Sequence, residues 1–462
     1  MEFFPKSIIF CILLVSFSLI ARGKQDTTYT RLLFVGDIMQ HGSQIRGAYH
    51  APSDRYSYEA CLKEASKLFQ RCDLVMGNLE LTLAGKPYQG YPKFSAPSQL
   101  IKDLQNAGLD IVATANNHTG DHGYTGIART SKKLDSLNMP YTGTFATQKD
   151  SRLFQPFMVN QNRIRIAIFN YTFATNLPLA KESSLVVSLL DSAKMKRQFA
   201  AARALRPDIT IAYLHWGTEY EKEPDSSQIA WGKFLHAQGV DIIIGSHPHT
   251  LQPIVWDKDE GKLTVYSIGN FLSGQRERFQ DGGLCLELVV CRLKSVDSTF
   301  VSKVIAHPAW VYKSSTAPAF YSVLFPYSSH ALSTARGKGY STQLDRFMTD
   351  TRKLVALSSG IELSLDTVLA GRQKRKTSYY QIGFALPRSP DEINDLVVKH
   401  PELTKTNGRT SLLGPFQTRT QATRAAQSLL EEAPDLYIEY VINTITHPSM
   451  QAQDSLSPPL KQ

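Results

Sequence analysis

The sequence has few cysteines, few glycines and prolines, and only one long apolar run. Five cysteines in 462 residues are too few for a disulfide-stapled fold. The 28 glycines and 23 prolines follow no regular period, which excludes collagen-like and mucin-like chains. The single apolar run excludes a protein that crosses a membrane several times. With 42% hydrophobic and 20% charged residues, the composition is that of a globular protein, of two or three domains by length.

Four of the cysteines lie outside the apolar run: Cys61, Cys72, Cys285 and Cys291. Cys285 and Cys291 share one strand-like segment and would lie about 20 Å apart along it, too far for a disulfide. A bridge between Cys61 and Cys72 is geometrically open. Buried free thiols are the preferred interpretation for all four.

The apolar run lies at the N-terminus and has the features of a secretory signal peptide. Lys6 precedes it, residues 7–21 carry no charge, and small residues stand at positions 21 and 23. We therefore predict a signal peptide over residues 1–23 and a secreted, periplasmic or cell-envelope protein. The alternative is an uncleaved N-terminal anchor, because the apolar core is long and a complete span needs ~20 apolar residues.

Positive charge exceeds negative charge in this chain. There are 51 Lys and Arg against 41 Asp and Glu, which gives a net charge of +10 and a pI of about 9.2. A basic exported protein suits an anionic partner, such as a phosphoester substrate, an anionic surface polymer or a membrane surface. No nucleic-acid partner is expected, because the predicted export signal removes the protein from nucleic acid.

Residues 31–293 alternate between short, β-branched apolar runs and amphipathic runs with helical spacing. Strands are predicted at 31–35, 73–77, 110–114, 163–169, 208–214, 241–245 and 263–269. Helices are predicted at 58–70, 98–107, 124–137, 192–204 and 227–238. This alternation is typical of an α/β fold with a largely parallel sheet covered by helices. Functional groups in such sheets gather beyond the carboxyl ends of the strands.

Polar side chains follow six of these predicted strands at the point where each strand ends. In chain order they are Asp37; Asn78 and Glu80; Asn116, Asn117 and His118; His215; His247 and His249; and Asn270. Packing alone would put apolar residues or plain turn formers at such positions. We therefore expect these groups to meet at one rim of the sheet.

Imidazole, carboxylate and amide oxygen together suit a divalent transition metal such as Zn²⁺, Mn²⁺ or Fe²⁺. His247 and His249 are alternate residues of an extended segment, so they point to opposite sides and can bind different ions of a pair. Glu80 is the candidate to bridge two ions, with Asp37 completing one position. The other position would be completed by Asn117, His215 and His247. Two ions ~3.5–4 Å apart can activate a water and stabilise displacement at phosphorus.

His118 is the candidate general acid. Asp121, three residues on, can hold its imidazole in one tautomer and so prepare it to protonate a leaving oxygen. Other interpretations remain open for single positions: Asp37 could cap a helix, the two asparagines before His118 could satisfy a turn, and His118 could be an ordinary loop histidine.

The sequence resembles the CapA, or poly-γ-glutamate capsule synthesis, family. The resemblance lies in GDIM (36–39), GNLE (77–80), ANNHTGDHGYTGIART (115–130), HWGTEY (215–220), GSHPHTLQ (245–252) and YSIGNF (266–271). That family is similar to the calcineurin-like metallophosphoesterases, which implies a four-layer αββα sandwich around a dinuclear metal site.

The resemblance also implies roles for individual residues. The implied metal ligands are Asp37, Glu80, Asn117, His215, His247 and His249, and the implied catalytic pair is His118 with Asp121. Substrate binding is assigned to Asn78, Asn116, Trp216 and Glu219, with core packing as the alternative for Trp216 and Glu219. The pattern departs from the superfamily at Glu80, where aspartate is usual, and at Met39, where histidine is usual; the nearest histidine is His41. These departures put one of the two metal positions in question.

The domain organisation is predicted from changes in composition. The metallophosphoesterase-like domain spans 30–310, a linker with a helix at 341–357 spans 311–377, and a small α+β module spans 378–443, before a disordered tail at 444–462. The module weakly resembles a SPOR domain, which implies peptidoglycan as a second partner. The alternative is a module that serves only packing or dimerisation.

These patterns predict an exported protein that acts in capsule or poly-γ-glutamate-like polymer biosynthesis, by metal-dependent phosphoester hydrolysis. The alternative is a polymer-binding or export-assembly component with the same fold and no catalysis. A third is hydrolysis or transfer at an amide of the polymer, because a dinuclear site can also activate water for attack on a carbonyl.

Overall fold

The structure is a computed structural model. It describes residues 27–148, 150–151, 155–178, 185–326, 333, 339–364, 374–385, 403–406, 410–416, 421–422, 424–427 and 437–448. The predicted signal peptide and residues 449–462 of the predicted tail lie outside the described residues. Among the helices that are described, none has the length and apolar character needed to cross a bilayer.

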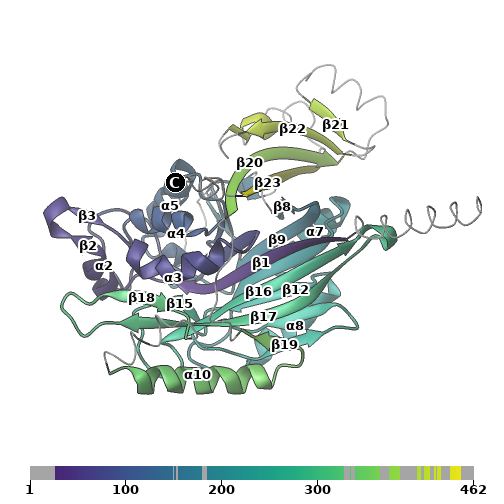
Figure 1. Ribbon diagram of the computed structural model, residues 1–462. Helices are drawn as coiled ribbons and strands as arrows, with labels where there is room; N and C mark the ends of the chain where they lie inside the picture. The colour runs from purple at the N-terminus through teal and green to yellow at the C-terminus, as the bar shows by residue number, and fades with distance from the viewer. Residues whose placement is uncertain are drawn as a thin grey trace, which may run out of the picture.

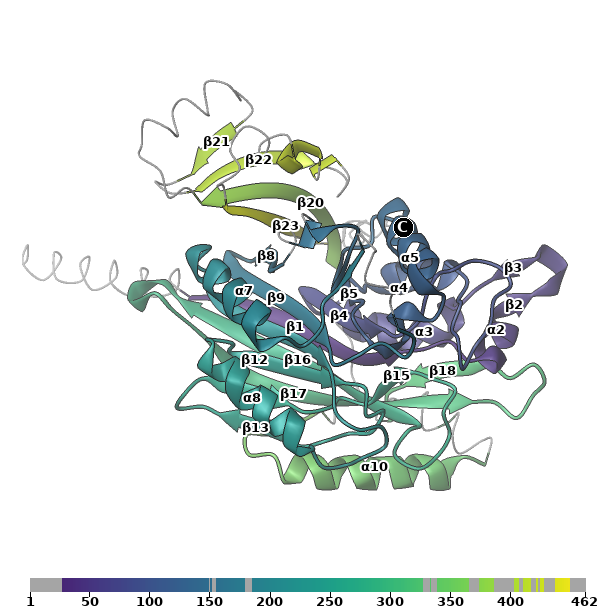
Figure 2. The same cartoon turned by 180° about the vertical axis from the view of Figure 1, so that it is seen from behind.

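Two large mixed sheets form the centre of the molecule (Figures 1 and 2). The first has the order β18 (Tyr321–Leu324), β17 (Ser298–Lys313), β16 (Gly282–Leu293), β1 (Thr27–Ile38), β4 (Leu74–Leu79), β5 (Ile111–Ala113), β6 (Tyr141–Thr142), with β15 (Asn270–Leu272) on β1 and β19 (Ile361–Leu363) on β17. The second has the order β13 (Ile254–Asp257), β14 (Lys262–Val265), β12 (Ile242–Ser246), β11 (Ile209–His215), β9 (Ile164–Thr172), β8 (Phe157–Gln161), β23 (Tyr437–Pro448), β20 (Lys374–Ala385), β22 (Thr410–Phe416), β21 (Leu403–Thr406).

Helices cover the outer faces of both sheets, so the molecule has four layers. Beside the first sheet lie α2 (Gly42–Ala48), α3 (Glu59–Phe69), α4 (Gln99–Ala107) and α5 (Gly123–Ser136). Over the second lie α7 (Ser192–Ala204) and α8 (Ser226–Ala237), and α10 (Ser341–Ala356) runs along the lower edge in Figure 1. Short 3₁₀ turns (Ala51–Ser53, Asn117–Gly120, Lys294–Val296) and strand pairs β2 (Tyr49–His50)–β3 (Arg55–Tyr56) and β7 (Thr144–Phe145)–β10 (Val186–Val187) complete the described elements.

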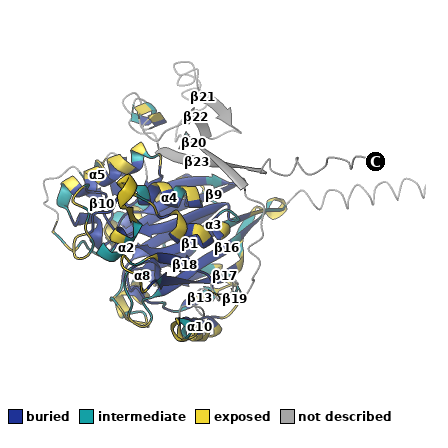
Figure 3. Cartoon of the chain, turned by 60° about the vertical axis from the view of Figure 1, so that its left-hand side comes forward, coloured by how far each residue is buried: buried dark blue, intermediate teal, exposed yellow. Residues whose placement is uncertain are grey.

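The alternation of side chains along each strand explains this layering. Leu32 and Phe34 of β1 enter the core between the sheets, whereas Leu33 and Val35 enter the core beneath α3 and α4. Strands β9, β11 and β12 divide their side chains in the same way, between the central core and the core beneath α7 and α8. Successive residues of a strand point to opposite faces, so continuous apolar strands require cover on both sides. Figure 3 shows the resulting buried strands between exposed outer helices.

The structure confirms the predicted α/β architecture of four layers. Each predicted strand and helix of the first part of the chain is present, with ends shifted by a few residues. The predicted strands pair parallel, as expected, in β1–β4–β5 of the first sheet and in β9–β11–β12–β14 of the second. The first sheet is nevertheless mixed, because β16 and β17, which are not among the strands predicted for the sheet, pair antiparallel with β1 and with each other. Only a short 3₁₀ turn separates β16 from β17, and such a short connection joins antiparallel neighbours. Among the described residues, the four cysteines are buried and none forms a disulfide, as preferred.

The part of the chain beyond residue 310 contributes to both sheets. β17 continues to Lys313, and β18 and β19 also belong to the first sheet, so the segment predicted as a linker supplies strands there. The predicted helix at 341–357 is α10. In the predicted C-terminal module, β23 pairs parallel with β8 through Val441, Ile442 and Asn443. β23 runs to Pro448, so residues 444–448 of the predicted tail lie in a strand.

Glu287 of β16 is a buried charge with two partners. Its Oε1 accepts from Arg31 Nη1 at 2.7 Å, and its Oε2 lies 2.9 Å from His307 Nε2. Burial alone would raise the pKa of this carboxyl, but the hydrogen bond and charges of His307 and Arg31 outweigh burial and lower the pKa. A lowered folded-state pKa stabilises the fold above the unfolded pKa of ~4.3, and this stabilisation is lost as the pH falls through the folded value.

Glu287→Gln is therefore expected to lower the free energy of unfolding by about 2–3 kcal/mol at neutral pH, measured by urea denaturation. The difference from the wild type should shrink below pH ~4. Glu362→Gln is the matched control, because Glu362 pairs with Lys303 at 3.5 Å on the exposed surface of β19 and should cost less than ~0.5 kcal/mol. Equal losses in the two variants would contradict the assignment.

Candidate metal centre

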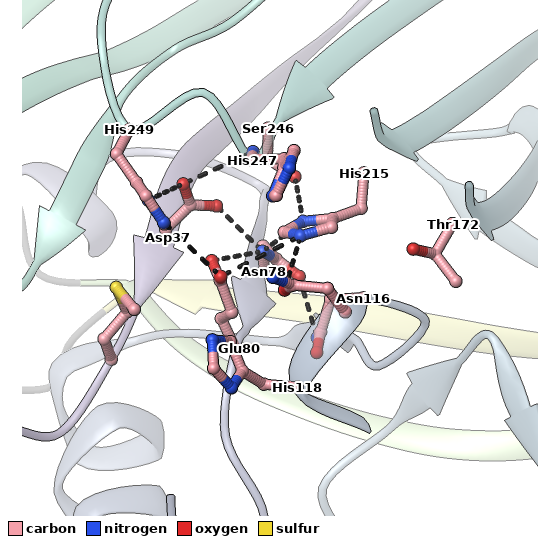
Figure 4. A network of polar contacts seen from close by, with 12 residues as sticks. Asp37, Asn78, Glu80, Asn116, His118, Thr172, His215, Ser246, His247 and His249 are labelled. Atoms are coloured by element: carbon pink, nitrogen blue, oxygen red, sulfur yellow. Dashed lines mark hydrogen bonds and ion pairs between the residues drawn. The ribbon is translucent and has the colours of Figure 1, made fainter. Parts of the chain in front are cut away.

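The polar residues predicted to meet at one rim do lie together, in a buried cluster where the carboxyl ends of strands from both sheets converge (Figure 4). The first sheet supplies Asp37 from β1, Glu80 just after β4, and the turn after β5. The second sheet supplies His215 from the end of β11 and the loop after β12. The site therefore depends on how the two sheets pack, and neither sheet forms it alone.

Asp37 is aimed into the cluster by an irregularity in β1. The register of β1 shifts between Val35 and Asp37 against β4, and again after Asp37 against β15. A bulge of this kind turns a strand and re-aims the side chain next to it. Gly36 makes the turn possible, because a Cβ there would lie 1.8 Å from the carbonyl oxygen of Gly269. Asp37 N–H then donates to that carbonyl at 3.1 Å.

Two groups of three side chains can each hold a metal ion, and both contain Glu80. One group is Glu80, His215 and His247, and the other is Asp37, Glu80 and His249; within each, the ligand atoms lie within 4.8 Å of one another. Figure 4 shows the Glu80 carboxylate between the Asp37–His249 side and the His215–His247 side. His247 and His249 fall into different groups, as predicted, although they lie in a bend after β12 and not in an extended segment. One shared carboxylate between two sets is the arrangement of a bridging ligand.

Atoms without partners show that these residues fit a cation. Glu80 Oε1 and His247 Nδ1 are buried and have no hydrogen-bond partner. Glu80 Oε1 lies 3.6 Å from His249 Nε2 and 3.8 Å from His215 Nε2, which is too far for a hydrogen bond. Buried unsatisfied polar atoms are costly, and a divalent ion would satisfy them together. Manganese, zinc and iron all accept this mixture of imidazole and carboxylate.

The protonation states of the cluster also suit metal binding. Burial, and then the neighbouring histidines, lowers the pKa of His247 to about 3, and burial lowers the pKa of His215 well below its ordinary value. Both imidazoles are therefore neutral at physiological pH, with lone pairs free to bind a cation. Burial, followed by the charge of Asp37, raises the pKa of Glu80 well above its ordinary value. An ion that binds here must displace the Glu80 proton.

The backbone around the two histidines is strained. His247 has φ 99° and His249 has φ 58°, in the left-handed region that residues other than glycine rarely occupy. Such strain persists where the surrounding structure requires a particular side-chain placement, and it clusters at functional sites.

Asn78 and Asn116, predicted to bind substrate, form an internal hydrogen-bonded support. Asn78 Nδ2 donates to Asp37 Oδ1 at 2.8 Å and lies 3.3 Å from Glu80 Oε2. Asn116 Nδ2 in turn donates to Asn78 Oδ1 at 3.2 Å and to the carbonyl of Leu79 at 2.8 Å. Both side chains are fully buried. They orient the two carboxylates, as groups that surround metal ligands commonly do.

Asn117 and the catalytic candidates lie on the turn after β5. Asn117 Oδ1 is 2.9 Å from His215 Nε2, so it lies beside the group that contains His215. His118 Nδ1–H donates to Asp121 Oδ2 at 2.8 Å, and the Phe94 backbone N–H donates to the same oxygen at 2.7 Å. The Phe94 ring packs edge-on against His118, with centroids 4.6 Å apart. The hydrogen bond to Asp121 fixes the tautomer and the orientation of the His118 ring, whose Nε2 lies 3.5 Å from Asn176 Nδ2.

The other predicted residues lie outside the cluster. Of the two alternatives for Trp216, the structure shows core packing: its ring lies beneath the outer helices, and its Nε1–H donates to the Tyr266 carbonyl at 2.9 Å. Glu219 is half-buried in the segment after β11. Met39 is buried, with its sulfur 3.7 Å from Ser273 Oγ. His41 is held by Gln44 and by the Gly274 N–H at 3.1 Å.

Two exposed aromatic residues lie at the site. Sequence reasoning missed Phe173, whereas Tyr220 belongs to the HWGTEY motif (215–220) that it singled out. Phe173 is 45% exposed, and its ring centroid lies 4.8 Å from that of His247 and 6.5 Å from that of His215. Tyr220 is 47% exposed, and its ring centroid lies 6.1 Å from that of His249. Phe173 directly follows β9, so the rule of strand ends could have found it, but that rule was applied to polar residues. These exposed rings therefore lie next to histidines of both metal-binding groups.

Divalent metal is expected to stabilise the protein more strongly at high pH. Without metal, the raised folded-state pKa of Glu80 means that the fold holds this proton more tightly than the unfolded chain does, so this stabilisation is lost as the pH rises through the raised pKa. With metal, the displaced proton is released more easily at high pH. The rise in melting temperature caused by Mn²⁺ or Zn²⁺ should therefore be larger at pH 8 than at pH 6. A rise that is greater at the lower pH would contradict Glu80 as a ligand.

The comparison with a family model and the comparison with curated proteins agree on one family. The model of a family described as bacterial capsule synthesis protein PGA_cap matches residues 31–275. The capsule biosynthesis protein CapA of Bacillus anthracis is 29% identical over 257 residues, which are 53% of this chain and 60% of that protein. The PGA biosynthesis protein CapA of Bacillus subtilis (strain 168) is 25% identical over 277 residues, which are 57% of this chain and 70% of that protein.

Solved structures are similar only at low scores. A novel phosphatase of Mycoplasma pneumoniae has a TM-score of 0.38 and 17% identity, over 61% of this chain and 94% of that one. A 5'-nucleotidase precursor of Thermus thermophilus has a TM-score of 0.37 and 12% identity, over 71% of this chain and 59% of that one. Similarity at this level says nothing about activity. The family match is different, because it covers more than half of the chain in one block that contains every residue of both metal-binding groups; the chain therefore belongs to the bacterial capsule synthesis protein family PGA_cap.

Proposed function

We propose that this protein acts in the biosynthesis of an anionic capsule polymer of the poly-γ-glutamate type, as a metal-dependent hydrolase of a phosphoester. The observation that carries the proposal is the Glu80 carboxylate, which is buried, lacks a partner at Oε1, and is shared by both metal-binding groups. The two curated CapA relatives supply the polymer class through their names, as capsule and PGA biosynthesis proteins.

The residues of the cluster would have distinct roles. Asp37, Glu80 and His249 would hold one ion. The other would be held by Glu80, His215, His247 and Asn117. Bound there, divalent ions supply an activated water and neutralise charge on an anionic ester. Asn78 holds the carboxylates of Asp37 and Glu80 in place.

His118 would donate a proton from Nε2 to the leaving oxygen, while Asp121 holds Nδ1–H and so keeps the ring oriented. The neutral, buried histidines and the surrounding core exclude bulk water from the ligands. The exposed rings of Phe173 and Tyr220 would contact the substrate at the mouth of the site.

The proposal includes export to the cell envelope, with the polymer or its phosphoester precursor as partner and peptidoglycan as a second partner of the C-terminal module. A second candidate function is a binding or assembly component without catalysis. Met39 favours it, because a buried thioether stands where the superfamily carries a histidine.

The decisive experiment is elemental analysis of the full chain after expression with added Mn, Zn or Fe, followed by assay with a generic phosphodiester before and after chelation. The hydrolase proposal expects bound metal and hydrolysis that disappears with chelation and returns with metal. Bound metal without any hydrolysis favours the assembly component, and absence of metal overturns both metal assignments.

A further inference from the structure

A second cavity, of about 350 Å³, lies between α10 and the segments that precede β13 and β16. One side of α10 forms a wall of it, through residues such as Arg346, Asp350 and Lys353. The opposite wall includes Lys222, Leu251, Arg276, Arg278, Phe279 and Asp281. Neither metal-binding group contributes a residue to this cavity.

The cavity carries an excess of positive charge. Its lining has five cationic side chains and three acidic ones: Lys222, Arg276, Arg278, Arg346 and Lys353 against Glu223, Asp281 and Asp350. Two of the acids already have partners. Asp350 is held by Arg278 at 2.8 and 3.0 Å, and Asp281 accepts from Trp310 Nε1 at 2.8 Å.

Several of the cations remain available for a ligand. Within the described chain, no ion pair is formed by Lys222, Arg346 or Lys353. Lys222 lies over the Phe279 ring, 5.0 Å from its centroid. A carboxylate bound in the cavity would satisfy such donors.

The cations are spread along the cavity and do not converge on one point. Arg346 and Lys353 are seven residues apart on α10, which places them about 10 Å apart along its axis. Apolar side chains such as Leu251, Phe279 and Leu354 lie in the same lining. A single phosphate headgroup needs convergent donors, whereas a chain with carboxylates at intervals along methylene segments matches spaced cations over an apolar floor.

The walls of the cavity continue from segments that carry site residues. Leu251 follows His249 by two residues. Asn270, whose Oδ1 is 3.1 Å from His249 Nδ1, donates from Nδ2 to Gln275 Oε1 and to the Gln280 carbonyl, both at 2.8 Å. Asn270 thus links the metal centre to the loop that forms part of the cavity.

We propose that this cavity holds a stretch of the acidic polymer, a chain of carboxylates separated by short methylene segments, close to the metal centre. The inference rests on the proposed function for the identity of the polymer. The cationic residues of α10 and Lys222 bind the carboxylates, and the apolar lining packs against the methylene groups.

The test measures binding of a fluorescently labelled γ-linked glutamate oligomer to the full chain by anisotropy at low salt. The double variant Arg346→Ala/Lys353→Ala should raise the dissociation constant about tenfold. Arg352→Ala is the matched control, because Arg352 is exposed on the same helix and does not line the cavity. It should leave the dissociation constant within about twofold. An oligomer of γ-linked isoglutamine, in which each free α-carboxylate is replaced by an amide, should not bind measurably.

Equal weakening in the double variant and the control would overturn the proposal, since binding would then reflect net charge alone. Full displacement of the oligomer by inorganic phosphate at equal anion charge would overturn it in favour of a phosphate site.

Glu80→Gln separates this proposal from the proposed function. Loss of metal with oligomer binding retained supports the cavity, and loss of both shows that the oligomer was bound at the metal centre and overturns the proposal. Absence of hydrolysis in the wild type, with cavity binding intact, would count against the hydrolase alone.

Discussion

Glu80→Gln should release both metal ions and reduce phosphodiester hydrolysis by at least about 10³-fold. Glutamine keeps the size of the side chain and removes its negative charge, and Glu80 is the one residue common to both metal-binding groups. Elemental analysis measures the metal, and steady-state kinetics the rate. The fold should persist, because the wild-type carboxyl is buried and its raised pKa already favours the neutral form when metal is absent.

Single-group variants are the controls for that result. His249→Ala should remove the ion of the Asp37 group and leave part of the metal content, because the other group lacks this residue. Glu219→Gln, an acid outside both groups, should keep full metal content. If Glu80→Gln lost no more metal than His249→Ala, the bridging role would be wrong.

His118→Ala should lower kcat by about 10²–10⁴-fold while the metal content stays unchanged. The reason is that the proton for the leaving oxygen would come from His118, whose Nδ1–H is fixed on Asp121 at 2.8 Å. The loss should be severe for esters of alcohols and small for esters of nitrophenol, because a good leaving group needs no proton. Comparison of the two substrate types measures the effect.

Two further variants control the His118 result. Asp121→Asn should cause a smaller loss and shift the pH profile of kcat, because it acts only by holding the imidazole. His50→Ala changes an exposed histidine on a distant hairpin and should leave the rate unchanged. Equal sensitivity of both ester types to His118→Ala would exclude a general-acid role and leave a purely structural one.

Local patterns in the sequence predicted most of the strands and helices of the fold. The segments at 31–35, 208–214 and 241–245 are continuous apolar runs, and each became a strand buried on both faces. The antiparallel placement of β16 and β17 was missed, because it depends on pairing between segments and leaves no mark in the period of either one. The pairing of β23 with β8 joins residues 283 positions apart, such as Met158 and Val441, and could not be predicted from either strand alone.

The candidate site could be predicted for the same reason, because the residues that follow each predicted strand can be identified in the sequence. Asn78 and Asn116 were assigned to substrate, whereas they hydrogen-bond within the cluster; their partners lie on other strands, so only three-dimensional packing reveals this. The core position of Trp216 could have been predicted from the alternation of side chains along an extended chain. His215 points toward the ligands, so the next residue along an extended chain points to the opposite face, where the helices cover it.

The parallel pairing of β23 with β8 has a practical consequence for shortened versions of the protein. A chain cut after α10 would leave the outer backbone groups of β8 without their neighbour, along a strand that begins with the buried residues Phe157, Met158 and Val159. An uncovered strand edge of this kind recruits other chains and promotes aggregation. Precipitation of such a fragment would then be explained by the exposed edge of β8. A soluble fragment would need another segment to pair with that edge.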